Sequence, residues 1–286
     1  MSELNIKGPV LLIGATGLLG SEISSALKAH KISVIEKDST SLDVTNGKAI
    51  AEAIETIQPT WIINAAAYTD VDKSETERES ARLINGVGPA QLAKAATAAK
   101  ARLIHFSTDY VFSGEGEKPW CETDPRNPLD RNWYGETKLM GEKAVLTFSE
   151  HLVMRVQWLY GKQRNRFVAL KDKESFSPFV DQFGAPTWTR DVVRALLVLM
   201  SQKASGLFHF AYDDFASWMD VYQFVKSELN LSVKLIPTRS RDLDLPAHRP
   251  LNGRLSNEKL KRQLGVQTLG SWKSSLREFL HQRQYD

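Results

Sequence analysis

The chain has 286 residues, of which 42% are hydrophobic and 25% charged, and its formal net charge is +3. This composition is typical of a globular protein and argues against intrinsic disorder, and the charge is too balanced to indicate a nucleic-acid partner. One cysteine, Cys121, excludes an internal disulfide framework and a multi-cysteine metal site, and we predict no metal. Without a leader peptide or a run of about 18 apolar residues, we expect a cytoplasmic protein with no membrane contact.

Short apolar runs alternate with helical patterns along the first half of the chain. The predicted strands cover residues 9–14, 32–36, 61–64, 102–106 and 152–156. The predicted helices cover residues 21–30, 47–57, 75–100 (interrupted near 86–89) and 134–150. Strands that are apolar throughout and alternate with helices predict an α/β fold of Rossmann type, with a doubly wound parallel sheet covered on both faces.

The alternation weakens after residue 160. Residues 190–201 and 218–229 have helical patterns, and 207–210 read as a strand. We therefore expect an NAD(P)-binding domain over 1–160 and a small substrate-binding lobe built mostly from 161–286, with some later segments returning to the first domain. Residues 226–262 hold nine basic and four acidic side chains, which form either a solvated face or a surface for an anionic substrate group.

A glycine-rich turn of the pattern G-x-x-G-x-x-G lies between the first predicted strand and the next helix. Glycine permits the tight turn, the approach of a pyrophosphate to the backbone, and close packing of helix on strand. The N–H groups at the start of the helix would then face the phosphates of a dinucleotide. The predicted cofactor contacts in this turn are Gly14, Thr16, Gly17, Leu18, Leu19 and Gly20.

Two adjacent side chains at the end of the second strand leave the choice between NAD and NADP open. Glu36 lies 19 residues past Gly17 and would hydrogen-bond a ribose hydroxyl, which favours NAD. Lys37 would instead accept a 2′-phosphate. In the next loop, Asp43-Val44 is predicted to meet the adenine, with a helix N-cap at Thr45 or Asn46 as the alternative interpretation.

Tyr134 and Lys138 are four residues apart in a predicted helix, so both project from one face. An unperturbed tyrosine has a pKa of about 10, and a nearby cation lowers that pKa. Such a pair can protonate a carbonyl oxygen while hydride reaches the carbon. Thr108 ends the fourth strand, where ligands bind in open α/β sheets, and is placed to hydrogen-bond the same carbonyl.

These motifs, in this order, resemble the extended short-chain dehydrogenase/reductase family, and within it the dTDP-4-dehydrorhamnose reductase branch. The stretches that carry the resemblance are the glycine turn, 42–45, 59–69 with 71–73, 107–112, 134–138 with 141–142, 155–160, 181–187 and 249–252. The resemblance implies NAD(P)H-dependent reduction of the 4-keto group of a nucleotide-linked 4-keto-6-deoxysugar, in dTDP-L-rhamnose synthesis. The sequence leaves the oligomeric state open, with a homodimer as one possibility.

The resemblance further implies residue roles. Tyr134 is the acid, Lys138 its electrostatic partner and a ribose ligand, and Thr108 the carbonyl donor. Ala65, Ala66 and Ala67 line the nicotinamide, while Val71, Asp109, Tyr110 and Trp158 surround the sugar. Trp158 is also compatible with a core aromatic position. Arg249 is expected to pair with the nucleotide diphosphate, or else to be exposed to solvent.

The substrate region departs from the branch's pattern. Residues 165–182 are several residues shorter than usual, Leu18 stands where Gln is frequent, and Gly253 replaces a frequent Ser. This motivates an alternative of another class: a non-catalytic NAD(P)-binding regulatory subunit, resembling that of methionine adenosyltransferase. The intact Thr108, Tyr134 and Lys138 argue against it. A different sugar-nucleotide reductase or epimerase of the extended family is the third hypothesis.

Overall fold

A parallel sheet of six strands forms the centre of the chain, whose computed structural model describes residues 6–163 and 167–282. In spatial order the strands are β2 (Val34–Lys37), β1 (Val10–Ile13), β3 (Trp61–Asn64), β4 (Arg102–Thr108), β5 (Leu152–Val156) and β10 (Gly206–His209). From β1 the chain passes to β2 on one side of β1, and then crosses back to β3 on the other side of β1. A ligand crevice is expected at that reversal, beyond the carboxyl ends of β1 and β3. The predicted doubly wound sheet is confirmed.

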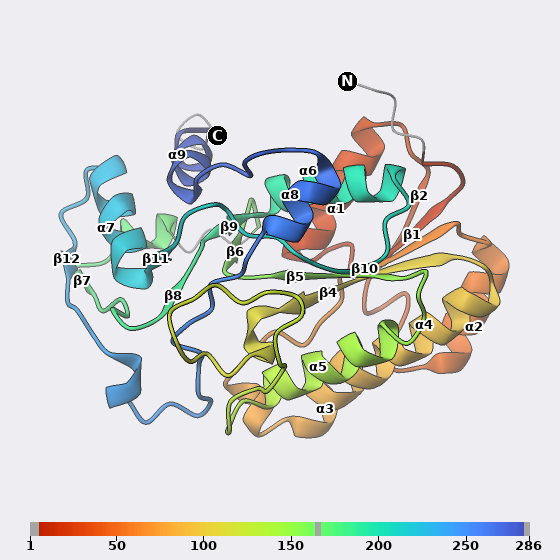
Figure 1. The fold of residues 1–286 in the computed structure, drawn as a ribbon, viewed down its shortest axis with the longest axis horizontal. Coiled ribbons are helices and arrows are strands. Elements are labelled where there is room, and N and C mark those ends of the chain that lie inside the picture. The colour runs from red at the N-terminus through yellow and green to blue at the C-terminus, as the bar shows by residue number, and fades with distance from the viewer. Residues whose placement is uncertain (1–5, 164–166, 283–286) are drawn as a thin grey trace.

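Helices cover both faces of this sheet (Figure 1). On one face, α1 (Leu18–Ala29) packs with α6 (Thr189–Ser201). On the other lie α2 (Gly47–Ile57), α4 (Gly88–Ala98) and α5 (Trp133–Val145). Alternate side chains of each strand enter the two cores: Ile104 and Phe106 belong to the first, and Leu103 to the second. This two-sided burial explains why the strands are apolar throughout.

The predicted helix over 75–100 forms as a series of connected pieces. After a short 3₁₀ turn, η1 (Lys73–Glu75), come α3 (Arg78–Arg82), a π-helical turn η2 (Leu83–Val87) and α4. The expected interruption near 86–89 is therefore a wider helical turn and not a break. Turns of this kind contain one extra residue and are frequent at functional sites. The predicted helix over 134–150 is shorter than expected, because α5 ends at Val145.

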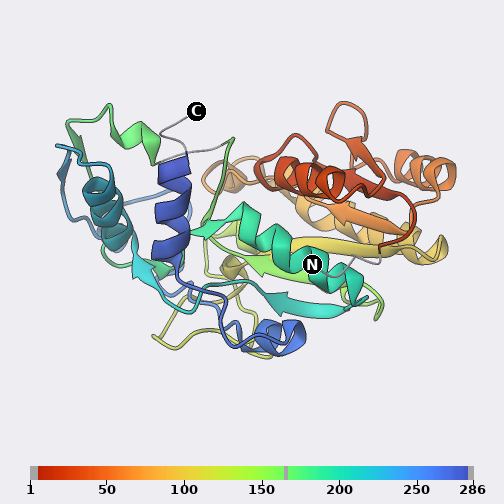
Figure 2. The ribbon, with the colours of Figure 1, turned by 90° about the horizontal axis from the view of Figure 1, so that it is seen from above.

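The final third of the chain builds most of a second lobe beside the sheet (Figure 2). The lobe contains α7 (Trp218–Glu228), α9 (Trp272–Gln282), η4 (Val168–Leu170), η5 (Ser240–Asp242) and paired short strands: β7 (Ser175–Phe176) with β12 (Lys234–Leu235), and β8 (Phe183–Gly184) with β11 (Ala216–Ser217). A further pair, β6 (Leu159–Tyr160) with β9 (Thr187–Trp188), leads into α6.

Three late elements lie with the sheet and not with the lobe. β10 pairs with β5, α6 packs on α1, and α8 (Glu258–Leu264) contacts α6 and β10. The boundary at residue 160 stays a prediction, since the chain crosses between the two parts more than once. Over the described ranges, no helix is both long and apolar enough to cross a membrane.

Candidate functional site

The glycine turn brings the backbone of three segments into close contact. Gly14 has a φ of +78°, which favours glycine, and a Cβ there would lie 2.6 Å from the amide nitrogen of Ala66. A Cβ on Gly20 would collide with the carbonyl oxygen of Gly14. Helix α1 begins beside Gly17 without a capping side chain. Its first N–H groups are thus available to phosphate oxygens, and the turn fits a dinucleotide.

The adenosine end of the predicted cofactor site contains two side chains in different situations. The carboxylate of Glu36 accepts hydrogen bonds from Lys28 Nζ, at 2.8 Å, and from Ser24 Oγ. The hydrogen bond from Lys28, followed by that from Ser24, lowers the pKa of Glu36. Within the described residues, the side chain of Lys37 forms no hydrogen bond or ion pair. Lys37 is therefore the freer of the two to meet a ligand.

The loop that follows β2 shows which residue caps the next helix and what Asp43 contacts within the protein. Its Oδ1 accepts hydrogen bonds from the backbone N–H and the hydroxyl of Thr45, both at 2.8 Å. Asn46, and not Thr45, caps α2, because its side chain accepts from the N–H groups of Lys48 and Ala49. Asp43 thus stabilises the loop next to Val44, which is buried in the core. A contact with adenine stays a prediction.

The segment Ala65–Ala67 follows β3 and lies between the glycine turn and the π-helical turn. Ala65 N donates to the carbonyl oxygen of Ile13, and Ala66 N donates to Asn64 Oδ1 at 3.1 Å. Tyr68 N donates to Asn85 Oδ1 at 2.9 Å, while Asn85 Nδ2 donates to the carbonyl oxygen of Tyr68. The backbone on the predicted nicotinamide side is therefore fixed by two buried asparagines. Asn64 lies in the stretch 59–69 that carries the resemblance, whereas Asn85 lies outside every motif.

Helix α5 presents Tyr134 and Lys138 toward the carboxyl end of β4. The side chain of Asn132 caps this helix by accepting from Gly135 N. The ring of Tyr110 packs edge-on against the ring of Tyr134, with 5.5 Å between centroids. Burial and the charge of Asp109 raise the pKa of Tyr134, and a hydrogen bond with Thr108 partly offsets the increase. Tyr134 is therefore a protonated phenol at neutral pH, which suits a proton donor.

Lys138 is buried beneath the tyrosine, with 3% of its surface exposed. Its Nζ donates to the carbonyl oxygen of Phe106 at 2.6 Å and lies 3.5 Å from His105 Nε2. Burial lowers the pKa of Lys138 to about 8, against the opposing charge of Glu142. Glu142 itself forms a fully buried ion pair with Arg155. The amine consequently titrates close to neutrality.

Thr108 and Asp109 form a hydrogen-bonded pair at the end of β4. Thr108 Oγ1 donates to Asp109 Oδ1 at 3.0 Å and accepts from Tyr110 N. Asp109 is 2% exposed, and burial raises its pKa to about 7. Its other oxygen, Oδ2, has no hydrogen-bond partner and lies where a Cβ on Gly253 would fall. The predicted Thr108, Asp109, Tyr110 and Tyr134 are therefore brought together.

Further buried polar atoms without partners occur on segments that adjoin this pair. β5 continues into Gln157, and the preceding Val156 is paired with Thr108. Neither the side-chain oxygen nor the nitrogen of Gln157 has a partner, and Gln182 Nε2 also lacks one. A Cβ on Gly184 would collide with Gln157 Oε1. Buried polar groups are normally hydrogen bonded, so this cluster indicates a place where a polar ligand or water belongs.

The remaining predicted substrate residues, Trp158 and Arg249, lie on different segments of the chain. Trp158 has a φ of +45°, its ring stacks on that of Trp218 with 4.0 Å between centroids, and its side chain is half-buried. Arg249 NH2 donates to Asp72 Oδ2 at 2.7 Å. Asp72 directly follows Val71 in the chain. The guanidinium is thus largely buried and paired with a carboxylate. The solvent-exposed alternative is wrong, and a contact with a diphosphate stays a prediction.

The basic excess over 226–262 does not form one surface. Lys234, Arg239 and Arg241 are exposed, whereas Arg254 lies over the ring of Phe183 and Lys259 donates to the carbonyl oxygen of Leu207. In the shortened stretch, residues 164–166 lie outside the described residues. The polar residues 171–174 are exposed.

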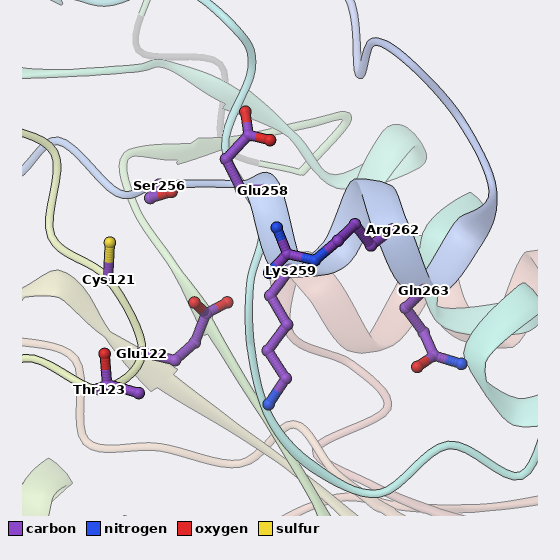
Figure 3. A pocket seen from close by; sticks show the side chains of 8 residues that line it. All are labelled: Cys121, Glu122, Thr123, Ser256, Glu258, Lys259, Arg262 and Gln263. Atoms are coloured by element: carbon purple, nitrogen blue, oxygen red, sulfur yellow. The ribbon is translucent and has the colours of Figure 1, made fainter.

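A hollow of about 610 Å³ lies between residues 121–123 and α8, and contains the thiol of Cys121 (Figure 3). No residue predicted for the site lines it, so the motifs and this hollow mark different places. Among the described residues, no group of three or more His, Cys, Asp or Glu side chains is arranged to hold a metal ion.

Comparisons with known proteins give matches over nearly the whole chain. The family model of the RmlD substrate binding domain matches residues 8–285. dTDP-4-dehydrorhamnose reductase of Escherichia coli (strain K12) is 36% identical over 297 residues, covering 96% of this chain and 97% of the relative. A crystal structure of a dTDP-4-dehydrorhamnose reductase from Clostridium acetobutylicum matches with a TM-score of 0.91 and 34% identity, covering 96% and 99% of the two chains. That from Bacillus anthracis, in complex with NADP, gives 0.90 and 30% over the same shares.

Proposed function

This chain belongs to the RmlD substrate binding domain family, and on that basis we propose that it is an NADPH-dependent reductase of the 4-keto group of a dTDP-linked 4-keto-6-deoxysugar. The substrate class is that of its dTDP-4-dehydrorhamnose reductase relatives. The observation that carries the proposal is the convergence of Thr108, Tyr134 and Lys138 beyond the carboxyl end of β4, beside a glycine turn suited to a dinucleotide.

The cofactor would be held by the residues predicted from the sequence. When bound, the reduced nicotinamide supplies the hydride for the carbonyl carbon. Gly14, Gly17 and Gly20 would bring the backbone to the pyrophosphate, and the segment Ala65–Ala67 would lie along the nicotinamide. Lys37 would bind the 2′-phosphate, because Glu36 is already bonded to Lys28 and Ser24.

Tyr134 would give its phenolic proton to the carbonyl oxygen. Its raised pKa keeps the proton in place until the oxygen acquires negative charge. Thr108 would donate a second hydrogen bond to the same oxygen, by turning its hydroxyl from Asp109. Lys138, one helical turn away, would stabilise the tyrosinate left behind when it carries its proton.

The sugar would bind against the partnerless polar atoms. Asp109 Oδ2, Gln157 and Gln182 Nε2 would bond its hydroxyls, and these bonds would satisfy buried groups that have no protein partner. Trp158, supported by its stack on Trp218, would cover the C–H face of the ring, near Val71 and Tyr110. Arg249 would exchange part of its contact with Asp72 for the diphosphate.

The test is to incubate the protein with dTDP-4-dehydrorhamnose and either NADPH or NADH. We expect oxidation of the reduced cofactor, faster with NADPH, and a product whose NMR spectrum shows reduction at C4. Other dTDP- and UDP-linked 4-keto-6-deoxysugars serve as the panel that defines the nucleotide and the sugar. Cofactor binding without turnover on any member of the panel would contradict the proposal.

That last outcome is what the regulatory-subunit hypothesis requires. The relatives described above are named as reductases, which favours the enzyme. The epimerase hypothesis predicts NAD retained through purification, and the proposed reductase predicts a cofactor that exchanges. Extracting and identifying any bound dinucleotide distinguishes these two.

The proposal includes a cytoplasmic location and a homodimer. The dimer is supported by an apolar face shared by α4 and α5, where Met140 is 40% exposed and lies beside Val87, Ala90 and Ala144. Light scattering on the purified chain measures its mass directly. A mass of one chain at micromolar concentration would contradict the dimer.

A further inference from the structure

A chain of hydrogen bonds runs beneath the proposed catalytic pair, through groups that the mechanism above does not use. Asn64 on β3 and His105 on β4 are opposite each other in the sheet, on the face that α5 covers. Asn64 Nδ2 lies 3.2 Å from His105 Nδ1, and His105 Nε2 lies 3.5 Å from Lys138 Nζ. His105 and Lys138 are both buried.

The orientation of the Asn64 amide determines which nitrogen of His105 carries the proton. Asn64 Oδ1 accepts from the backbone N–H of Ala66, so its amide nitrogen must face the imidazole. An amide nitrogen only donates, and His105 Nδ1 must therefore be an acceptor without a proton. The imidazole is neutral, because burial and the charge of Lys138 keep the pKa of His105 well below its usual range. Its single proton then lies on Nε2, toward Lys138.

An Nε2–H group beside Lys138 has an electrostatic consequence. An ammonium group has three donors and no acceptor, whereas a neutral amine has a lone pair. The Nε2–H therefore opposes the charged form of Lys138 and can donate to the neutral form. The charged or titratable groups near the lysine come from two elements. Glu142 acts on it from the same helix α5, Tyr134 precedes it by one turn of that helix, and His105 faces it from β4.

We propose that His105 is a positioning residue for Lys138: its Nε2–H, oriented by Asn64 and so by the backbone of Ala66, holds the amine and weakens its affinity for a proton. This inference rests on the proposed function only in assigning Lys138 to the reaction. His105 would then keep the lysine able to exchange its proton near neutral pH. The same hydrogen bonds would connect the lysine to the backbone of Ala66, which is predicted to line the nicotinamide.

The first test needs no substitution and no cofactor. Long-range ¹H–¹⁵N correlation spectra of the protein distinguish the two neutral tautomers of histidine. We expect His105 to carry its proton on Nε2. A proton on Nδ1 would overturn the proposal, since Nε2 would then accept from the ammonium and strengthen its proton affinity.

The second test reverses the tautomer. In Asn64→Asp, one carboxylate oxygen can still accept from Ala66 N, while the other faces His105 Nδ1 and requires a proton there. We expect the ¹³Cε resonance of Lys138 to titrate with a proton affinity about tenfold higher or more. His105→Phe, which removes the N–H, is expected to raise the affinity in the same direction. An unchanged Lys138 titration in His105→Phe would overturn the proposal.

Two controls separate this effect from its alternatives. The double variant Asn64→Asp/His105→Phe measures the direct effect of the new carboxylate, because the imidazole is absent. A rise from Asn64→Asp that is equally large on the His105→Phe background would overturn the tautomer mechanism. His151→Phe removes another buried imidazole, which lies 3.2 Å from Leu103 N and away from Lys138, and is expected to leave the Lys138 titration unchanged.

In kinetics, the high-pH limb of the kcat profile should move to higher pH in His105→Phe, while His151→Phe keeps the wild-type profile. The spectroscopic measurements are made on the cofactor-free chain. They therefore hold whether or not the protein reduces a sugar nucleotide, and a failure of the proposed activity leaves them interpretable.

Discussion

Beside the proposed cofactor segment, three buried polar side chains of β3, η2 and α5 are bonded to the protein, whereas on the proposed sugar side several have no partner. Asn64, Asn85 and Lys138 each have defined donors or acceptors. Asp109 Oδ2 and both polar atoms of Gln157 have none. The two sides are therefore at different stages of readiness for a ligand. We expect the first to be organised by the fold alone and the second to be completed by a ligand that supplies the missing hydrogen bonds.

The largest effect is expected where the two sides meet. Tyr134→Phe removes the proposed proton donor from the boundary between them and should lower kcat by about 10²- to 10⁴-fold, the usual contribution of a general acid. NADPH affinity, measured by fluorescence titration, should stay near the wild-type value because the cofactor side is already organised. Turnover of the variant at nearly the wild-type rate would show that another group protonates the substrate.

The cost of burying the Asp109 carboxyl group on the sugar side can be measured without substrate. Burial raises its pKa from 3.8 to about 7, so the folded chain binds this proton more tightly than the unfolded chain. The free energy of unfolding contributed by this group therefore falls as pH rises from about 4 to about 7, by a few kcal/mol at the most.

Urea unfolding of wild type and Asp109→Asn at the two ends of that pH range measures this contribution. The amide does not titrate, so the variant should lack this part of the pH dependence. An identical pH dependence in the two proteins would mean that Asp109 is ionised in the fold and finds its partner elsewhere.

A matched pair of substitutions compares the two sides directly. Asn85→Leu removes hydrogen bonds to both backbone polar groups of Tyr68 and should reduce the free energy of unfolding by about 1–3 kcal/mol, the cost of groups left unsatisfied. Gln157→Leu removes an amide that has no partner, and should be neutral or stabilising.

The readout for this pair is the midpoint of urea unfolding, together with KM. Gln157→Leu should raise KM for the sugar nucleotide while leaving the KM for NADPH unchanged. Equal destabilisation by both substitutions would remove the distinction between an organised and an incomplete side.

The smallest effect is expected at the outer end of the cofactor side. Lys37→Glu should lower kcat/KM for NADPH by about tenfold, corresponding to about 1.4 kcal/mol, and leave that for NADH close to wild type. Steady-state kinetics with both cofactors provides the measurement, with the exposed Lys31→Glu as a matched charge control. Loss of activity with both cofactors alike would mean that Lys37 does not contact the 2′-phosphate.

The sequence predicted the turn, strand and helix that carry the proposed catalytic residues, whose roles stay predictions. The glycine turn, Thr108 and the Tyr134–Lys138 pair are local patterns on strands and helices whose periodicity is strong. The sequence did not indicate a role for Asn85 or His105, because their partners are in other elements. Asn85 reaches Thr137 across 52 residues of sequence, and His105 stands in an apolar strand where a lone polar residue gives no periodic signal.

The sugar side was harder to predict because distant segments assemble it. Arg249 pairs with Asp72 across 177 residues, and Gly253 packs against Asp109. Sequence alone placed Trp158 and Arg249 through resemblance, but it gave no indication that Gln157 and Gln182 would be buried without partners. Which polar atoms remain unsatisfied depends on the packing of the whole lobe, and no local pattern encodes it.

The π-helical turn at Leu83–Val87 has a consequence for how this protein tolerates changes in length. A π turn holds one residue more than an α-helical turn, so deleting a residue there would restore regular α-helix and rotate α4 by about 100° relative to α3. Asn85 would then leave Tyr68 and Thr137, and the apolar face of α4 would turn away from the sheet. A single-residue gap, harmless in a surface loop, would here misalign a whole layer of the fold, so this stretch should keep its length even where its side chains vary.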